Sequence, residues 1–94
     1  MNNIFINQKT PKEINLLIAS RIRSIRKRRK LSQERLSQKS GVSLGSVKRF
    51  ESSGEISLNS LVKLAIALDC DSDLEGLFRD VPFDSIQEVI DEQD

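Results

Sequence analysis

Residues 31–51 read LSQERLSQKSGVSLGSVKRFE, and this stretch predicts two short helices joined by a tight turn. Ser32 can accept a hydrogen bond from the first turn of a helix that starts at Gln33. Gly41 supplies the left-handed backbone conformation that commonly ends a helix. Ser43 can then cap a second helix in the same way as Ser32 caps the first.

Apolar residues at helical spacing indicate how the two helices pack. One comes from the first helix, one from the turn and two from the second helix: Leu36, Val42, Val47 and Phe50. Their interlocking would fix the angle between the helices, and the second helix should end before Gly54. Two helices joined by a three- to four-residue turn form a helix-turn-helix, whose second helix enters the major groove of DNA.

The residues before this motif predict a longer helix. Thr10, Pro11 and Glu13 match a capping box with proline at the first helical position. An apolar stripe follows, which should face the core: Ile14, Leu17, Ile18, Ile22 and Ile25. Basic residues lie largely off that stripe: Arg21, Arg23, Arg26 and Lys27.

The residues after the motif predict further helices, so the fold class is all-α. Ser57 can cap a helix with an inward apolar face, made of Leu58, Leu61, Leu64, Ala65 and Leu68. Residues 72–75 read SDLE, a second capping-box pattern, and would open a short fifth helix ending near Arg79. Asp84 could start a sixth. Residues 1–9 contain Ile4-Phe5-Ile6, which fits either an ordered strand or an arm that becomes ordered on dimerisation.

Charge is distributed unevenly along the 94 residues, although the formal net charge is only +1. Residues 1–50 carry a net charge of about +11 and residues 51–94 about −10. This asymmetry favours a front half that binds a polyanion and an acidic rear half that repels nucleic acid or binds a basic protein. Two solvated faces that neutralise each other would also explain it.

The composition of the chain argues against several classes of function. The chain has no histidine and one cysteine, Cys70, so it offers no disulfide, no Cys/His metal site and no activated nucleophile. We therefore expect no enzyme, no metal and no cofactor. The apolar runs are too short for a membrane span or a secretory signal, which predicts a cytoplasmic protein.

The motif resembles the lambda-repressor-like family, also called the xenobiotic response element family of helix-turn-helix regulators. The matching residues, in order, are Leu31-Ser32-Gln33, Leu36, Ser40-Gly41-Val42-Ser43, Val47 and Glu51. The resemblance implies a five-helix DNA-binding domain over residues 11–80, between an N-terminal arm (residues 1–10) and an acidic C-terminal tail (residues 81–94). Ser37 replaces the family's usual alanine, and the link from Glu51 to glycine is one residue longer than usual, which leaves the end of the second helix open.

The resemblance also implies which residues contact DNA. The positions that face bases are Leu44, Gly45, Ser46 and Arg49, and those nearer the phosphates are Gln33, Ser43 and Lys48. Arg49 could pair bidentately with guanine or clamp a phosphate instead, and Gln33 could be an ordinary exposed glutamine. In the basic run, Arg28, Arg29 and Lys30 are the best candidates for phosphate contact, with a solvated helix face as the alternative.

These features predict a sequence-specific repressor that binds an operator as a homodimer and regulates its own operon. The alternative is an antitoxin, because residues 50–58, followed later by residues 84–90, are similar to HipB-like antitoxins that neutralise HipA-like kinase toxins. A toxin would then bind the acidic C-terminal half. Four tail residues could serve a partner, a dimer interface or the domain core: Phe83, Ile86, Val89 and Ile90. An adaptor that uses the fold without binding DNA is a third possibility, which the basic front half opposes.

Overall fold

The computed structural model describes residues 8–80, which form five helices and no strand. The helices are α1 (Pro11–Arg28), α2 (Gln33–Ser40), α3 (Leu44–Ser53), α4 (Leu58–Ala67) and α5 (Asp71–Glu75). The predicted all-α, five-helix fold is confirmed over this part of the chain. The Ile4-Phe5-Ile6 arm, the helix predicted from Asp84 and the tail residues Phe83, Ile86, Val89 and Ile90 lie outside the described residues.

Side-chain caps start the first four helices as the sequence predicts. The hydroxyl of Thr10 accepts from the Glu13 backbone N–H at 3.1 Å, and the Glu13 carboxylate accepts from the Thr10 N–H at 3.0 Å. Three serines each accept a backbone N–H three residues on: Ser32, Ser43 and Ser57. These contacts satisfy N–H groups that have no partner within a helix.

Two glycines end the helices of the motif. Gly41 and Gly54 have φ angles of 78° and 80°, a left-handed conformation that costs little only in glycine. The end of α3 is thereby settled at Ser53, one residue before Gly54. Within the motif, the Ser37 hydroxyl donates to the Val42 carbonyl at 2.6 Å, so the serine that departs from the family pattern has a partner of its own.

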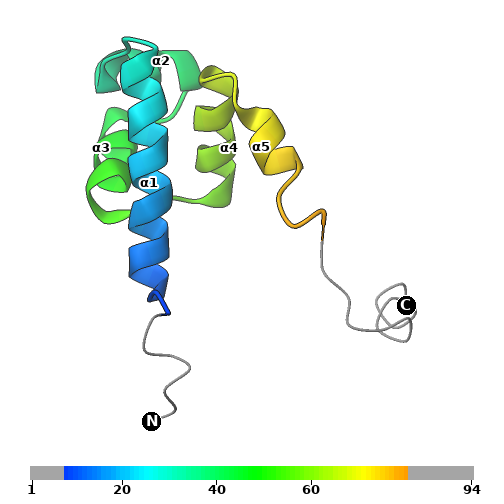
Figure 1. The fold of residues 1–94 in the computed structure, drawn as a ribbon. Coiled ribbons are helices and arrows are strands. Elements are labelled where there is room, and N and C mark those ends of the chain that lie inside the picture. Colours follow the sequence, from blue (N-terminus) through cyan, green and yellow to red (C-terminus); the bar gives the residue numbers. More distant parts are fainter. Residues whose placement is uncertain (1–7, 81–94) are drawn as a thin grey trace.

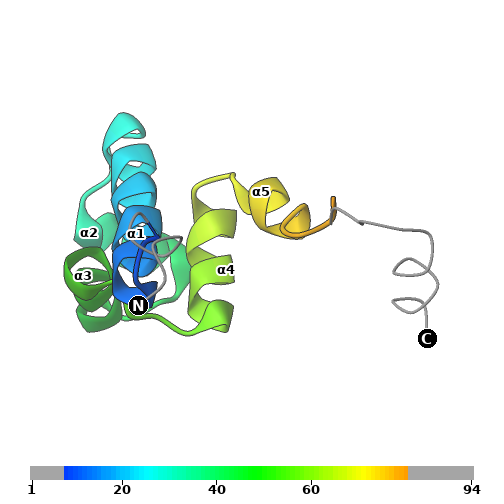
Figure 2. The same ribbon diagram turned by 60° about the horizontal axis from the view of Figure 1, so that its bottom comes forward.

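The core lies where α1, α2, α3 and α4 converge. In Figures 1 and 2, α1 runs between α3 on one side and α4 on the other, and α5 leads away from the end of α4. The four interlocking residues predicted from the motif are buried in one cluster: Leu36, Val42, Val47 and Phe50. Their burial in one cluster confirms the predicted packing of the first helix of the motif against the second.

The predicted apolar faces of α1 and α4 are wrong at three positions, Ile14, Ile18 and Leu58. Ile14 and Ile18 are 44% and 38% exposed, and Leu58 is 69% exposed. Figure 1 shows the first turns of α1 extending beyond the other helices, and Leu58 is the first residue of α4. Ile18 and Leu58 line an open hollow together with Phe50, Ile56 and Leu61. The buried residues of α1 are Ala19, Ile22 and Arg26, and of these only Ile22 belongs to the predicted stripe. Ile25, also in the stripe, is partly buried against the core.

The capping box predicted at residues 72–75 is also wrong. Helix α5 begins at Asp71, has no side-chain cap and ends at Glu75 rather than near Arg79. The Cys70 N–H donates to the Ala65 carbonyl at 2.9 Å, so backbone contacts with the end of α4 determine where α5 starts. Phe78 is left-handed, with a φ of 61°, which prevents continuation of the helix.

None of the helices within residues 8–80 has both the length and the apolar character needed to cross a bilayer.

Candidate nucleic-acid interface

Helix α3 has one buried face and one exposed face. Val47 and Phe50 are at most 1% exposed, whereas Gly45, Ser46 and Arg49 lie on the open side. This alternation follows from the helical period, because residues three or four positions apart share one face of a helix and the residues between them lie on the other faces. Of the residues predicted to face bases, only Leu44 is half-buried, and Lys48 is exposed as well.

Gly45 lies in the first turn of α3 with free space around it. A Cβ atom built on this residue would meet nothing within 4 Å. Glycine inside a helix is less stable than alanine by up to about 1 kcal/mol. The packing of the chain therefore does not require glycine at this position.

Ser43 and Ser46 lie together at the start of α3. The Ser43 hydroxyl accepts from the Ser46 N–H at 3.2 Å and donates to the Ser46 hydroxyl at 2.8 Å. Both residues are exposed. The cap thus places two hydroxyl groups at the positively polarised end of α3, where an anion is favoured.

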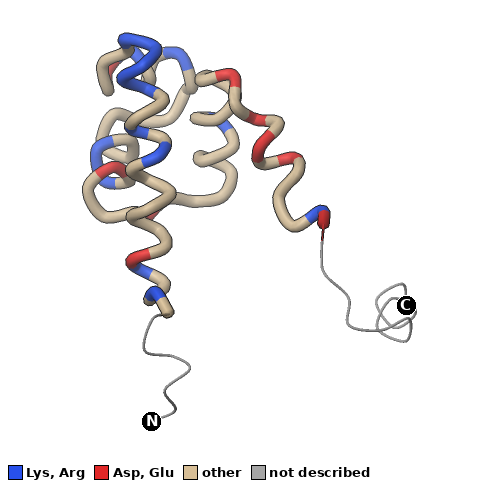
Figure 3. Tube along the Cα trace, viewed as in Figure 1, with Lys and Arg blue, Asp and Glu red and all other residues tan. Residues whose placement is uncertain are grey.

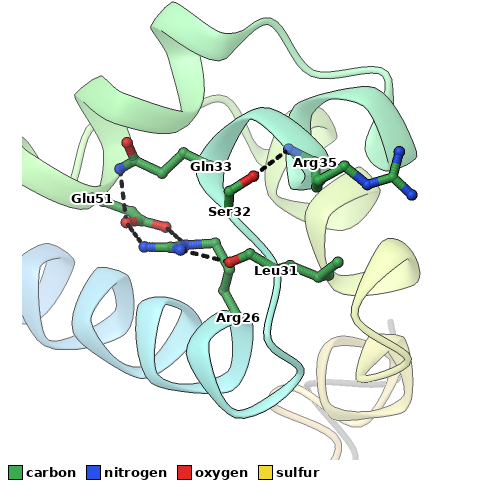
Figure 4. A network of polar contacts seen from close by, with 6 residues as sticks. All are labelled: Arg26, Leu31, Ser32, Gln33, Arg35 and Glu51. Carbon is green, nitrogen blue, oxygen red and sulfur yellow. Dashed lines mark hydrogen bonds and ion pairs between the residues drawn. The ribbon is translucent and has the colours of Figure 1, made fainter.

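A buried polar network joins α1, α2 and α3 (Figure 4). Arg26 donates to both carboxylate oxygens of Glu51, at 2.8 and 2.9 Å, and to the Leu31 carbonyl at 2.8 Å. The Gln33 amide donates to Glu51 at 3.0 Å. The side chains of Arg26 and Glu51 are only 9% and 5% exposed. The network therefore holds the last turn of α3, which carries Glu51, against α1 and against the first residue of α2.

The same network sets the protonation of Glu51. Burial acts to raise the pKa of its carboxyl group, but the hydrogen bonds from Arg26 and Gln33 and the positive charges of Arg26 and Arg23 outweigh it and lower the pKa below 4.5. Glu51 is thus ionised at neutral pH, as its pairing with Arg26 requires.

A hollow of about 510 Å³ opens beside this network, between α1, α2 and α3. Its lining combines exposed cations with the start of α2: Arg23, Arg26, Ser32, Gln33, Lys48, Glu51 and Ser52. Arg23 and Lys48 are both exposed. A helix N-terminus with two cations beside it has the chemistry to hold a phosphate group.

The basic residues that end α1 lie apart from this hollow. Arg28 lines a hollow with Arg21 and Asp73, and Arg29 pairs with Asp69 at 3.3 Å. Lys30 is exposed in the turn that follows. Of the residues predicted to contact phosphates, Gln33 and Lys48 thus line the same hollow. Arg28 and Arg29 lie on the α4 and α5 side of the molecule.

Figure 3 shows how the opposite charges separate along the chain. Lys and Arg concentrate on the second half of α1 and on α3, while Asp and Glu concentrate on the turn after α4 and on α5. The face formed by α1, α2 and α3 is thus the one that can attract a polyanion.

Cys70 does not have the surroundings of a catalytic thiol. Burial raises the pKa of its thiol, and the nearby carboxylate of Asp73 acts in the same direction. The thiolate is the nucleophilic form, so both effects disfavour reaction.

The sequence analysis misses two contributors to this face and ranks a third too low. Arg26 is expected off the buried face, yet it anchors the network, and Ser52 lines the hollow without having been named. Arg23 belongs to the predicted basic run but is not among its best candidates for phosphate contact, although it lines the hollow. Arg23 and Arg26 are three residues apart on one helix, so they lie on the same side of α1. This spacing is the feature of the sequence that could have indicated their shared role.

Comparison with known families agrees with this geometry. A model of the family described as helix-turn-helix matches residues 22–74, which is more than half of the chain and includes α2 and α3. No curated protein matches the chain. The chain belongs to the lambda-repressor-like helix-turn-helix family of DNA-binding transcription regulators.

Proposed function

We propose that this protein represses transcription by binding a specific DNA operator, including one that controls its own operon. The observation that carries the proposal is the exposed face of α3, which includes Gly45, a glycine that the packing of the fold does not require. The ion pair between Arg26 and Glu51 fixes this helix against α1. A bare backbone at Gly45 would let the helix approach the floor of the major groove closely.

The exposed face of α3 offers complementary chemistry to base edges. Arg49 can pair with the O6 and N7 atoms of guanine, and Ser46 can bond to several bases. Leu44, which is half-buried at the start of α3, can contact a thymine methyl group with its accessible part. Gly45 has no side chain, so its only contribution would be to let the backbone of α3 come close to the bases.

Phosphate contacts would position this helix. Gln33, Ser43 and Lys48 remain our candidates, and the hollow adds Arg23. For Lys30, Arg28 and Arg29 the role is a prediction from the sequence, and the last two would need DNA to reach the α5 side of α1.

A single short recognition helix contacts too few base pairs to select one site in a genome. We therefore propose that the protein acts as a homodimer on a near-palindromic operator, with two half-sites spaced by about one helical turn.

The experiment is an anisotropy titration of the purified protein on the DNA upstream of its own gene and on a scrambled copy. Measurements at about 50 and 200 mM salt separate phosphate attraction from base recognition, because phosphate contacts weaken steeply with salt. Selective binding that persists at the higher salt concentration supports the proposal. Equal affinity for both duplexes contradicts it.

A second candidate function, neutralisation of a partner protein, is favoured by the surface that follows α4. Leu77 and Phe78 are 52% and 81% exposed. Acidic residues lie in the same part of the chain: Asp69, Asp71, Asp73, Glu75 and Asp80. Exposed apolar groups among carboxylates suit a partner with a basic, partly apolar surface, such as a HipA-like kinase toxin.

This second candidate is tested with a kinase encoded beside the gene for this protein. Inhibition of kinase activity should be retained in Arg49→Ala and lost in Phe78→Ala or after deletion of residues 81–94. Kinase activity that is unaffected by the wild-type protein contradicts the antitoxin function.

A further inference from the structure

The loop between α3 and α4 places a carboxylate directly beside Arg49. The Nε and Nη2 atoms of Arg49 donate to the same oxygen of Glu55, at 3.4 and 3.3 Å. Both side chains are exposed, at 69% and 61%. The exposed arginine of α3 thus has an acidic partner in the loop that follows this helix.

The position of Glu55 is set by the backbone around it. The Ser53 hydroxyl donates to the Arg49 carbonyl at 2.6 Å and accepts from the Glu55 N–H at 3.2 Å. Gly54, between them, is buried against the backbone of Asn15. The loop is therefore tied to the same turn of α3 that carries Arg49.

The pairing uses one edge of the guanidinium group and leaves another free. Arginine has five N–H donors in a rigid plane. With the Nε and Nη2 edge directed at Glu55, the donors on Nη1 and the second donor on Nη2 remain available. Those end-on donors form the fork that matches O6 and N7 of guanine.

Packing alone does not hold Arg49 in this orientation. A hollow of about 340 Å³ adjoins the pair, lined by Ser46, Arg49, Glu55, Ile56, Ser57 and Ser60. The guanidinium group could swing into this space or toward a phosphate. The contact with Glu55 is the interaction that opposes such motion.

We propose that Glu55 is a positioning residue that sets base specificity by directing Arg49 toward guanine and away from the phosphate backbone. This inference rests on the proposed function, in which Arg49 recognises a base. Glu55 does so in two ways: it orients the guanidinium group, and its own negative charge near the DNA penalises binding to duplexes that offer no base contact in return.

Stability would not explain the pair. Exposed ion pairs add little to the free energy of folding, so Glu55→Gln should fold as the wild type does. Glu75→Gln is the matched control, because it removes the same charge from an exposed position on α5, on the far side of α4 from α3. Thermal unfolding of the full chain checks that both variants are folded.

The test measures the affinity of the full chain for two duplexes. One is selected by the wild-type protein from a randomised library, and the other is its scrambled copy. We expect Glu55→Gln to lose about five- to tenfold on the selected duplex and to gain a few-fold on the scrambled one, and Glu75→Gln to change both slightly and equally. Arg49→Ala should cost less in the Glu55→Gln background than in the wild type, because the two residues act together.

The possible outcomes separate the two ideas. If Glu55→Gln changes both affinities by the same factor, or neither, the positioning role is overturned while the proposed function stands. Equal losses from Arg49→Ala in both backgrounds overturn it as well. If the wild-type protein selects no sequence from the library, the proposed function fails and this inference fails with it.

Discussion

Arg26 and Glu51, 25 positions apart, form a two-pronged ion pair in which each carboxylate oxygen accepts from a different guanidinium nitrogen, at 2.8 and 2.9 Å. Both side chains are nearly inaccessible to solvent. Arg26 belongs to α1 and Glu51 to α3. The pair therefore connects the helix proposed to enter the major groove to the longest helix of the domain.

Removal of one member of this pair should destabilise the protein strongly. Arg26→Ala leaves a buried carboxylate without its partner, which typically costs about 3–5 kcal/mol in the free energy of unfolding. Urea denaturation monitored by circular dichroism measures this loss. The double variant Arg26→Met, Glu51→Leu should recover most of it, since neither charge is then left unpaired. A loss below about 1 kcal/mol in Arg26→Ala would contradict the importance of the pair.

The lowered pKa of Glu51 predicts a contribution to acid sensitivity. Since the folded-state pKa lies below the ordinary value of 4.5, this stabilisation is fully present above about pH 4.5 and is lost as the pH falls through the folded-state pKa. Unfolding free energies measured from pH 7 down to 3 should decline for the wild type. The decline should be smaller in Glu51→Gln, although hydrogen bonds from Thr10 also lower the pKa of Glu13 and leave a residual slope. Identical slopes would show that Glu51 is not responsible.

The two left-handed glycines should respond differently to alanine. Gly41→Ala meets no atom within 4 Å and incurs only the conformational cost of about 1–2 kcal/mol. At Gly54 the new Cβ would lie 2.8 Å from the Asn15 carbonyl carbon, so overpacking adds about 1–3 kcal/mol. Thermal or urea unfolding of the two variants provides the comparison. Equal destabilisation would mean that α1 and α3 can separate easily.

At Gly45, stability and DNA binding should change in opposite directions. Gly45→Ala should raise the free energy of unfolding by about 0.5–1 kcal/mol, because alanine loses less conformational freedom in a helix. If α3 approaches the groove closely at this point, the added methyl group should weaken binding to a selected duplex by about tenfold. Unchanged affinity would remove the proposed close approach.

Arg49 and Gln33 should differ in how they affect specificity. Arg49→Ala should relax the preference for one base pair in each half-site, at about 1–3 kcal/mol. Gln33→Ala should weaken binding to all sequences alike, as expected for a phosphate contact. Titrations on a panel of singly substituted operators distinguish the two patterns. Equal losses on every sequence for Arg49→Ala would end its base-recognition role, and a base-selective loss for Gln33→Ala would reassign that residue.

The starts of α1 to α4 and the ends of α2 and α3 could be predicted from the sequence because local interactions determine them. Thr10, Ser32, Ser43 and Ser57 each cap through a contact three residues away, and Gly41 ends α2 with its own backbone. Contacts of this range need no knowledge of the rest of the fold. The capping box at residues 72–75 failed because the turn after α4 had already set the start of α5.

The partners of individual charged side chains could not be predicted in this way. Arg23, Arg26 and Arg29 belong to one basic run, yet Arg23 lines a hollow beside α3, Arg26 is buried against Glu51 and Arg29 pairs with Asp69. Likewise, only the packing of α1 against α3 distinguishes the crowded Gly54 from the open Gly45.

Helix caps and the 3.6-residue period thus determine the helices and the presence of a helix-turn-helix, since both act within a few residues of the chain. Tertiary structure decides which arginine stays exposed on α3, which one supports α3 from α1 and which glycine can accept a side chain. Those outcomes depend on contacts between residues distant in sequence, such as Arg26 with Glu51, that form only once the helices pack.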